Sequence, residues 1–465
     1  MTRQPEQNHR SGYRDVLRVC LPLVLGMSAT TVMEFTDRVF LSNYSVEAIS
    51  AVVPAGISAY LFLAFFGGIT GYAGVFIAQY FGSGSTTRIG AVLWQGIYLT
   101  LFSAGICWLL ALFITGPLFA FAGHADEVRV LEEIYFSILC KGSFLHVAVC
   151  TLSTFFTGRG ITRPVMIITL IGVVANIPLD YALIYGKWGL PEMGVTGAAI
   201  ATVMSWGVNF ALLALLIFTP KNNKDFGVFS AYQIDLKLLL RLLQFGIPGS
   251  LQFTLDILAF TIFILLVGRI GTEQLAATNI VLSINAVAFM PSMGVSQGIT
   301  VMVGQALGRR NVPEAQTAVR KAIHLLLAYI VVIDLLFIFL PEPILALFIQ
   351  EGGEAGSIST VMSTGIQLLR IISAYLLLDA LYMVFSGALK GAGDTRFLMI
   401  SIGVSSLFCL ILPVYFGISY FGMGVQAAWS CVLLFIIVLF LLSAGRYRTG
   451  KWKKMLVIEK EFQKP

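Results

Sequence analysis

Long apolar runs separated by short polar segments follow one another along nearly the whole chain. An α-helix rises about 1.5 Å per residue, so roughly 20 apolar residues are needed to cross about 30 Å of hydrocarbon. On this basis the pattern predicts twelve transmembrane helices. Their approximate spans are 16–41, 49–80, 90–115, 133–156, 164–185, 195–218, 238–268, 277–306, 321–340, 366–389, 397–417 and 423–445.

The longest polar break in the middle of the chain, residues 219–236, divides the predicted helices into two sets of six. We expect residues 1–225 to form an N-terminal six-helix lobe with the start of a cytoplasmic linker. Residues 226–465 are expected to form a C-terminal six-helix lobe with a basic cytoplasmic tail. The predicted fold class is therefore an all-α integral membrane protein, with twelve transmembrane helices in two pseudo-symmetric six-helix bundles.

The two halves also repeat each other in sequence. Residues 158–167 (GRGITRPVMI) return 233 residues later as 391–400 (GAGDTRFLMI), with six of ten residues identical. A second register, at an offset of 226, pairs Pro22, Glu47, Ala51, Gly68, Gln79 and Gly82 with Pro248, Glu273, Ala277, Gly294, Gln305 and Gly308. Repeated membrane bundles are typical of transporters whose central site lies between two similar lobes.

Composition indicates that these apolar runs lie in a lipid membrane, because 57% of the residues are hydrophobic and 12% are charged, with a mean hydropathy of +0.87. Most Lys and Arg lie at the two ends of the chain or in loops after even-numbered helices. This distribution predicts a multi-pass protein of the cytoplasmic (inner or plasma) membrane with both termini cytoplasmic. The net charge of +6 is thus a topology signal and does not indicate a nucleic-acid partner. We expect the amphipathic stretch 452–462 to lie on the anionic cytoplasmic leaflet.

Carboxylates inside the first six predicted helices are the clearest candidates for function, since each costs free energy to place in a membrane. They include Asp37 and Asp180. Asn176 shares a helix face with Asp180, and Thr202 on the next helix could add another oxygen. Such oxygens suit a hard cation such as Na⁺, and two neighbouring aspartates could instead share a proton. The alternative is a salt bridge or polar cluster that only fixes helix packing.

The second half carries a different set of intramembrane polar residues. Asp256 lies on the seventh predicted helix, and Tyr375 precedes Asp379 by one turn on the tenth. Tyr375 could donate to Asp379 or face a cationic ligand. These three residues are a candidate coupling or substrate site.

On the first helix, Glu34 and Arg38 are spaced as a local ion pair.

Motifs for other sources of energy or chemistry are missing from the sequence. It has no phosphate-binding loop of the nucleotide-hydrolysing type, no His-Glu-x-x-His and no Cys-x-x-Cys. Transport would therefore be driven by an ion gradient, with no cofactor beyond Na⁺ or H⁺ as the coupling ion. We do not expect an enzyme, because the carboxylates are divided between two lobes.

Taken together, these features resemble the multidrug and toxic compound extrusion (MATE) family, in its NorM- and DinF-like branch. The resemblance covers essentially the whole chain. It rests on the two six-helix halves, Pro22 followed by Asp37, Asn176-xxx-Asp180, Ala198-xxx-Thr202 and the two Gly-x-Gly-x-Thr-Arg loops.

The resemblance implies a V-shaped pair of bundles that exports organic cations and amphipathic drugs in exchange for Na⁺ or H⁺. Its partners would be these small molecules and membrane lipid, and we expect a monomer. In the first lobe, the family's cation site matches Asp37, Asn176, Asp180 and Thr202, and ion binding is linked to bending of the first helix at the residue matching Pro22.

Asp256, Tyr375 and Asp379 match acidic and aromatic positions of the family's second lobe, where the family usually has Glu on the seventh helix. An alternative is a flippase for lipid-linked oligosaccharides from the same superfamily. Flippases typically carry a more basic cavity for an anionic lipid carrier, whereas the embedded charges here are mostly acidic. The sequence leaves the choice between Na⁺ and H⁺ open.

Overall fold

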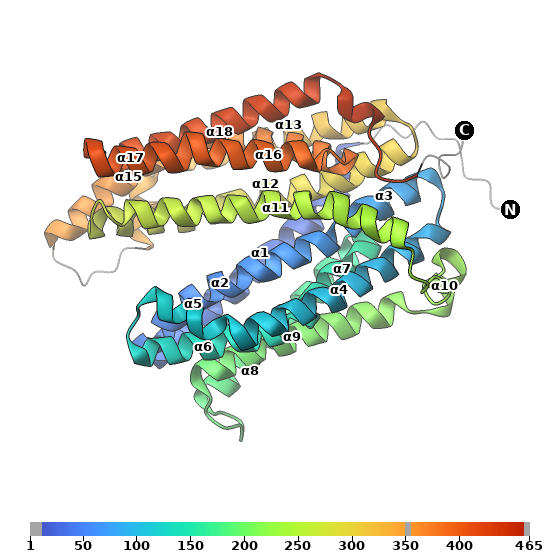
Figure 1. Cartoon of the computed structure of the whole chain (residues 1–465). Helices are drawn as coiled ribbons and strands as arrows, with labels where there is room; N and C mark the ends of the chain where they lie inside the picture. The colour runs from blue at the N-terminus through green and yellow to red at the C-terminus, as the bar shows by residue number, and fades with distance from the viewer. Residues whose placement is uncertain (1–11, 349–354, 460–465) are drawn as a thin grey trace. The chain divides into compact units, whose positions relative to one another are not determined.

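A computed structural model describes residues 12–348 and 355–459, and this part of the chain is helical, without strands (Figure 1). Within these described residues, eleven helices are long and apolar enough to cross a membrane, and a bent pair, α6 and α7, makes a twelfth if it is one span. The predicted all-α membrane fold is confirmed, and the predicted spans agree with the observed helices to within several residues at most ends. In the first half, the helices are α1 (Tyr13–Tyr44), α2 (Val46–Gly71), α3 (Ala73–Ser83), α4 (Thr87–Phe113), α5 (Thr115–Ala122), α6 (Asp126–Lys141), α7 (Ser143–Thr157), α8 (Arg163–Tyr185), α9 (Gly194–Ile217) and α10 (Pro220–Phe226).

The second half follows the same order of long helices. Its elements are α11 (Leu236–Val267), α12 (Thr272–Gly308), α13 (Val312–Phe339), α14 (Pro341–Ala346), α15 (Ala355–Ala392), α16 (Thr395–Ser405), the π-helical segment η1 (Ser406–Ile411), α17 (Leu412–Phe421), α18 (Val425–Arg448) and the short 3₁₀ helix η2 (Lys451–Lys454). The π-helical turn precedes Pro413 and lets the chain pass this proline without ending the span.

The packing of the helices divides the chain into two compact units. Of the described residues, unit 1 comprises 12–24, 255–348 and 355–456, and unit 2 comprises 25–254 and 457–459. Both α1 and α11 therefore contribute their N-terminal part to one unit and their C-terminal part to the other. These boundaries lie inside helices rather than at residue 225, where the polar linker suggests a division of the sequence.

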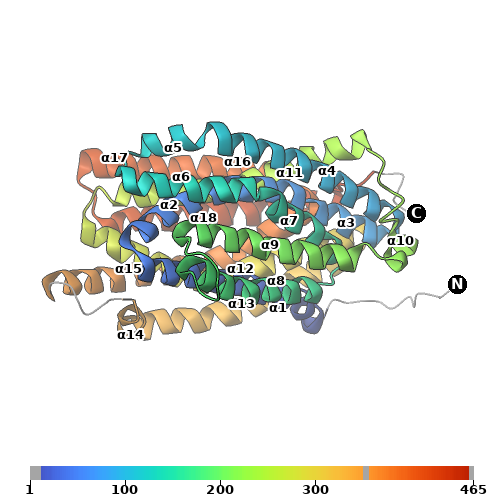
Figure 2. The ribbon, with the colours of Figure 1, turned by 90° about the horizontal axis from the view of Figure 1, so that it is seen from below.

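Unit 2 is built around helices that pack in pairs: α8 with α9, α2 with α6, and α4 with α7. Figure 2 shows α8 and α9 running alongside each other. Gly197 of α9 permits their close approach, because a Cβ atom there would lie 2.6 Å from the Leu183 carbonyl oxygen. Ser205 fixes the same pair by donating to the Gly172 carbonyl oxygen at 2.8 Å.

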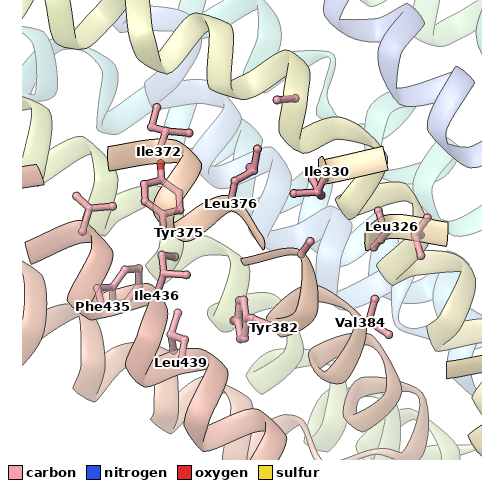
Figure 3. Close-up of a cluster of buried hydrophobic side chains, with 14 of the residues drawn as sticks. Leu326, Ile330, Ile372, Tyr375, Leu376, Tyr382, Val384, Phe435, Ile436 and Leu439 are labelled. Atoms are coloured by element: carbon pink, nitrogen blue, oxygen red, sulfur yellow. The ribbon is translucent and has the colours of Figure 1, made fainter. Parts of the chain in front are cut away.

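Unit 1 is centred on α15, which packs against α12, α13 and α18. Its core is apolar and includes the side chains drawn in Figure 3. The first turns of α1 complete this unit, since a Cβ atom on Gly294 of α12 would lie 2.9 Å from the Val24 Cα atom.

Equivalent backbone contacts in the two units confirm the internal repeat. Gly160 and Gly393, which are 233 residues apart, both have positive φ, of 75° and 101°. The amide of the next residue bonds to the carbonyl oxygen five residues before it in both loops, at 3.0 Å for Ile161 and 2.9 Å for Asp394. Gly68 of α2 likewise packs on Ser250, as Gly294 packs on Val24. The repetition is therefore one of packing as well as of sequence.

One predicted helix and one predicted surface segment differ from the structure. The fourth predicted span, 133–156, bends by 43° at Gly142, where a Cβ atom would lie 2.5 Å from Val203 Cγ2. The expected membrane-surface stretch is wrong for its described part, because Trp452, Val457 and Ile458 are at most 2% exposed in the protein core. Residues 460–462 of that stretch lie outside the described residues.

Candidate cation site in unit 2

Helices α1 and α8 bring two acidic side chains together in the interior of unit 2. The carboxyl groups of Asp37 and Asp180 are neighbours that affect each other's charge, and Asn176 is a further neighbour of Asp180. Asp37 is 7% exposed, whereas Asn176 and Asp180 are fully buried. One helical turn separates Asn176 from Asp180, so the two side chains project from the same face of α8.

Polar atoms of these three residues lack conventional partners within the described part of the chain. They are Oδ1 of Asp37, both carboxylate oxygens of Asp180 and both amide atoms of Asn176. An ionised carboxylate only accepts hydrogen bonds, so two of them can be bonded to each other only if one carries a proton. Without a proton or a cation between them, two adjacent buried negative charges are strongly destabilising. The geometry therefore suits a bound positive charge.

Thr202 lies on α9, the helix that packs alongside α8, and it is 7% exposed. Its hydroxyl donates to the carbonyl oxygen of Ala198 at 3.0 Å. Donation uses the hydroxyl hydrogen and leaves the oxygen able to accept, as a cation ligand must. The roles assigned from the sequence to Asp37, Asn176, Asp180 and Thr202 stay predictions.

Tyr135 is a neighbour of this acidic pair that the sequence did not single out. It lies on α6, is 7% exposed, and falls within electrostatic range of Asp37 and Asp180. A tyrosine in an apolar helix is common, so its sequence position gives no signal of this placement. Tyr135 thus places a hydroxyl within electrostatic range of the two carboxylates.

Glu34 and Arg38 lie on the exposed side of α1. They attract each other electrostatically, but among the described ion pairs none joins them. The expected local ion pair is therefore not formed as a close contact. Glu34 also lies near Tyr60 of α2.

Unit 1 holds the second set of candidate residues. Asp379 lies within electrostatic range of both Asp256 and Tyr375. The Tyr375 hydroxyl is buried without a hydrogen-bond partner in the described part of the chain, so of the two alternatives for this residue, donation to Asp379 is not seen. Figure 3 shows Tyr375 among apolar side chains of unit 1, including Ile372 and Leu376. A buried hydroxyl left without a partner is available to a ligand.

The positions of unit 1 that are equivalent to the acidic pair carry no charge. Asp37 corresponds to Phe263 at the offset of 226, and Asp180 to Pro413 at the offset of 233. Phe263 is fully buried and meets Trp429 edge to face, with the ring centroids 5.6 Å apart. Thr202 corresponds to Phe435, which is also fully buried. The scaffold is thus repeated without the polar residues of the candidate cation site.

Pro22, the predicted hinge, lies within α1, which continues through it as a helix. The helix passes from unit 1 to unit 2 between Val24 and Leu25, two residues after this proline. A proline removes one backbone hydrogen bond and permits a bend. Asp37 lies on the part of α1 that belongs to unit 2.

Among the described residues outside the membrane-spanning helices, two charged groups, Arg159 and Asp235, have shifted pKa values. Burial lowers the pKa of Arg159, in the first repeated loop, to about 10, and Asp225 opposes this shift. Burial tends to raise the pKa of Asp235. Hydrogen bonds from the Leu238 amide and the Arg88 guanidinium outweigh burial, so the pKa of Asp235 lies below its usual value.

Comparison with known proteins places this arrangement in a family. A family model described as MatE matches residues 22–182 and 248–416, one segment in each half of the chain. The chain belongs to the MatE family. The two matched segments contain Asp37, Asp180, Asp256 and Asp379.

Curated MatE relatives cover nearly the full chain. A probable multidrug resistance protein NorM of Thermotoga maritima is 28% identical over 460 residues, covering 96% of this chain and 95% of the relative. A protein of the same description from Synechocystis is 27% identical over 422 residues, covering 90% and 87%.

Solved structures of MATE-type proteins share the fold. A transporter of the MOP superfamily from Pyrococcus furiosus matches with a TM-score of 0.85 at 23% identity, covering 95% of this chain and 97% of that one. A MATE structure in complex with MaL6 matches with a TM-score of 0.86 at 22% identity and the same coverage.

Proposed function

We propose that this MatE protein is an antiporter that exports organic cations and amphipathic drugs across the cytoplasmic membrane by alternating access, driven by Na⁺ or H⁺. The observation that carries the proposal is the buried pair Asp37 and Asp180, in which three of the four carboxylate oxygens have no hydrogen-bond partner in the described part of the chain. The relatives named as multidrug resistance proteins support the class of substrate.

Antiport requires that the ion and the drug favour opposite states of the transporter, since otherwise the ion gradient does no work. Helix α1 is suited to link these states, because Asp37 lies on its unit 2 part and its first turns pack in unit 1. Neutralising the acidic pair with a proton or Na⁺ removes the repulsion between Asp37 and Asp180. This change would alter how α1 packs beyond Pro22 and favour release of the drug.

Transport by inverted vesicles tests the proposal and identifies the ion. A fluorescent organic cation is added outside vesicles that carry either an imposed Na⁺ gradient or an imposed pH gradient, each tested separately. The gradient that drives dye uptake names the coupling ion. Dye uptake under neither gradient, with the protein folded, would contradict ion-coupled export.

Matched variants test whether the coupling ion binds at the acidic pair. Asp37→Asn and Asp180→Asn should each abolish gradient-driven uptake while leaving expression unchanged. Asp126→Asn is the control, because the Asp126 side chain is 91% exposed and pairs with Arg129 on its own helix, at 3.5 Å. Normal uptake in either Asp37→Asn or Asp180→Asn would contradict the proposal that this pair couples transport to the ion.

In unit 1, Asp256, Asp379 and Tyr375 are proposed to bind the cationic part of the drug or to assist coupling. Asp379→Asn should raise the KM for a cationic dye more than the KM for an uncharged amphipathic substrate. An equal effect on both substrates would assign Asp379 to coupling or to packing instead.

A further inference from the structure

The segment that follows α18 is anchored in both units. Trp452 is fully buried in the unit 1 core and stacks on Tyr447, with the ring centroids 4.9 Å apart. Its indole nitrogen donates to the Tyr447 carbonyl oxygen at 3.0 Å. The end of α18 is itself fixed in unit 1, because Arg446 Nε lies 2.6 Å from Asp394 Oδ2. The tail therefore starts from a rigid position.

Five residues later the tail belongs to unit 2. Val457 and Ile458 lie in the apolar core of that unit and are at most 2% exposed. The Val457 amide donates to Gln79 Oε1 at 2.8 Å, and its carbonyl oxygen accepts from the Arg241 guanidinium. The backbone amide and carbonyl oxygen of Val457 are thus both hydrogen-bonded to side chains of unit 2.

Glu459 adds a charged anchor to the same surface of unit 2. Its carboxylate accepts from the Tyr80 hydroxyl and lies 3.5 Å from Arg241 Nη1 and 4.0 Å from Arg88 Nη2. These residues come from α3, α4 and α11, so the tail ties three helices of unit 2 to one point. A carboxylate shared by a hydroxyl and two guanidinium groups is held by charge-assisted contacts.

We propose that residues 452–459 form a clasp, a short chain segment anchored at Trp452 in unit 1 and at Val457 to Glu459 in unit 2, which limits how far these two anchoring points can move apart. The chain passes between the units three times, and two of these crossings lie inside α1 and α11. Crossings inside helices can serve as pivots, whereas the third follows the end of a helix. Five residue steps can span at most about 18 Å, so the sites that hold Trp452 and Val457 cannot be farther apart than this while both residues stay anchored.

The clasp must therefore stay closed within this reach or release its unit 2 anchor whenever the units separate further. Release exposes Val457 and Ile458 to solvent and leaves the Arg241 and Glu459 charges apart. This inference does not depend on the transported substrate or on the coupling ion. It adds a restraint on conformational change that lies away from the acidic pair.

Distance measurements between spin labels test the clasp. In the full-length chain without its native cysteines, labels are placed at Lys221→Cys in unit 2 and Arg320→Cys in unit 1, both exposed positions. The test variants are Val457→Asp, which puts a charge into the unit 2 core, and Glu459→Gln. The matched control is Lys453→Gln, which changes an exposed charge of the same segment.

We expect Val457→Asp and Glu459→Gln to broaden the distance distribution and shift it to longer distances, while Lys453→Gln leaves it unchanged. Arg241→Gln should cause a shift like that of Glu459→Gln, and the double variant should shift little further, because both changes open the same contact. These mild variants keep the test valid if Val457→Asp does not fold. Unchanged distances in Glu459→Gln and Arg241→Gln would overturn the clasp.

Discussion

At the scale of single residues, Asp37 and Asp180 could be identified from the sequence because a carboxylate in an apolar helix is costly and therefore conspicuous. Their proximity could be suggested only by the family resemblance, since it depends on how α1 packs against α8. Tyr135 was not identified at all. Its hydroxyl comes within electrostatic range of the carboxylates through the packing of α6 on α2 and α9, and nothing in its sequence neighbourhood indicates this.

Tyr135→Phe tests whether that hydroxyl assists the site. A hydrogen bond or favourable dipole of about 0.5–1.5 kcal/mol corresponds to roughly a 2- to 10-fold change in ion affinity. We expect the ion concentration for half-maximal dye uptake to rise by this factor, with little change in thermal stability. Tyr329→Phe, which removes a hydroxyl that donates to the Ala288 carbonyl oxygen in unit 1, is the control. Equal ion dependence in Tyr135→Phe and wild type would exclude the role.

Asp235 gives a prediction about stability and pH. Its pKa is lowered in the folded protein, so its contribution to stability is present above its unfolded pKa of about 3.9 and is lost as the pH falls through the lower folded value. Asp235→Asn should therefore lower the melting temperature in detergent at pH 7 and make a smaller difference at pH 3. A difference that grows as the pH falls would contradict this sign.

At the scale of helices, the apolar runs predicted nearly every span, because the length of hydrocarbon sets the length of each run. They could not predict the bend at Gly142 or the π-helical turn before Pro413. Both depend on the neighbouring elements rather than on hydrophobicity. A glycine at a bend looks in sequence like any glycine in a membrane helix, and here the side chain of Val203 occupies the space that a Cβ atom would need.

Gly158, at the end of α7, is predicted to be intolerant of a side chain. A Cβ atom there would lie 2.7 Å from Ile77 Cγ2 and 2.8 Å from the Gly74 carbonyl oxygen. Gly158→Ala should therefore cost about 1–3 kcal/mol of stability and lower the melting temperature in detergent.

The control for this substitution is Gly105→Ala in α4, where nothing lies within 4 Å of the added atom. Alanine is favoured over glycine inside a helix by about 0.5–1 kcal/mol, so this variant should be neutral or slightly stabilising. Similar melting temperatures for the two variants would contradict the prediction, because they would show that Ile77 and Gly74 can move aside at little cost.

At the scale of the whole molecule, the sequence repeat predicted two similar bundles, and the repeated loop and helix contacts agree with it. The repeat could not predict where packing divides the chain. Sequence similarity follows the order of duplication, whereas packing follows contacts such as those of Val24 with Gly294 and of Ser250 with Gly68. The two halves therefore exchange the first turns of α1 and α11.

Because of this exchange, the first turns of α1 can pack only after a much later part of the chain has been synthesised. Cys20 of α1 contacts Val295, which is 275 residues later in the chain. At about 5–20 residues per second, α1 waits about 14–55 s in the membrane before that partner has been made. Residues 226–465 produced alone would lack the first turns of α1, and residues 1–225 alone would lack those of α11. Each half is consequently an unfinished folding intermediate until the other is present, and only co-production of both should yield stable protein from a chain cut in the linker.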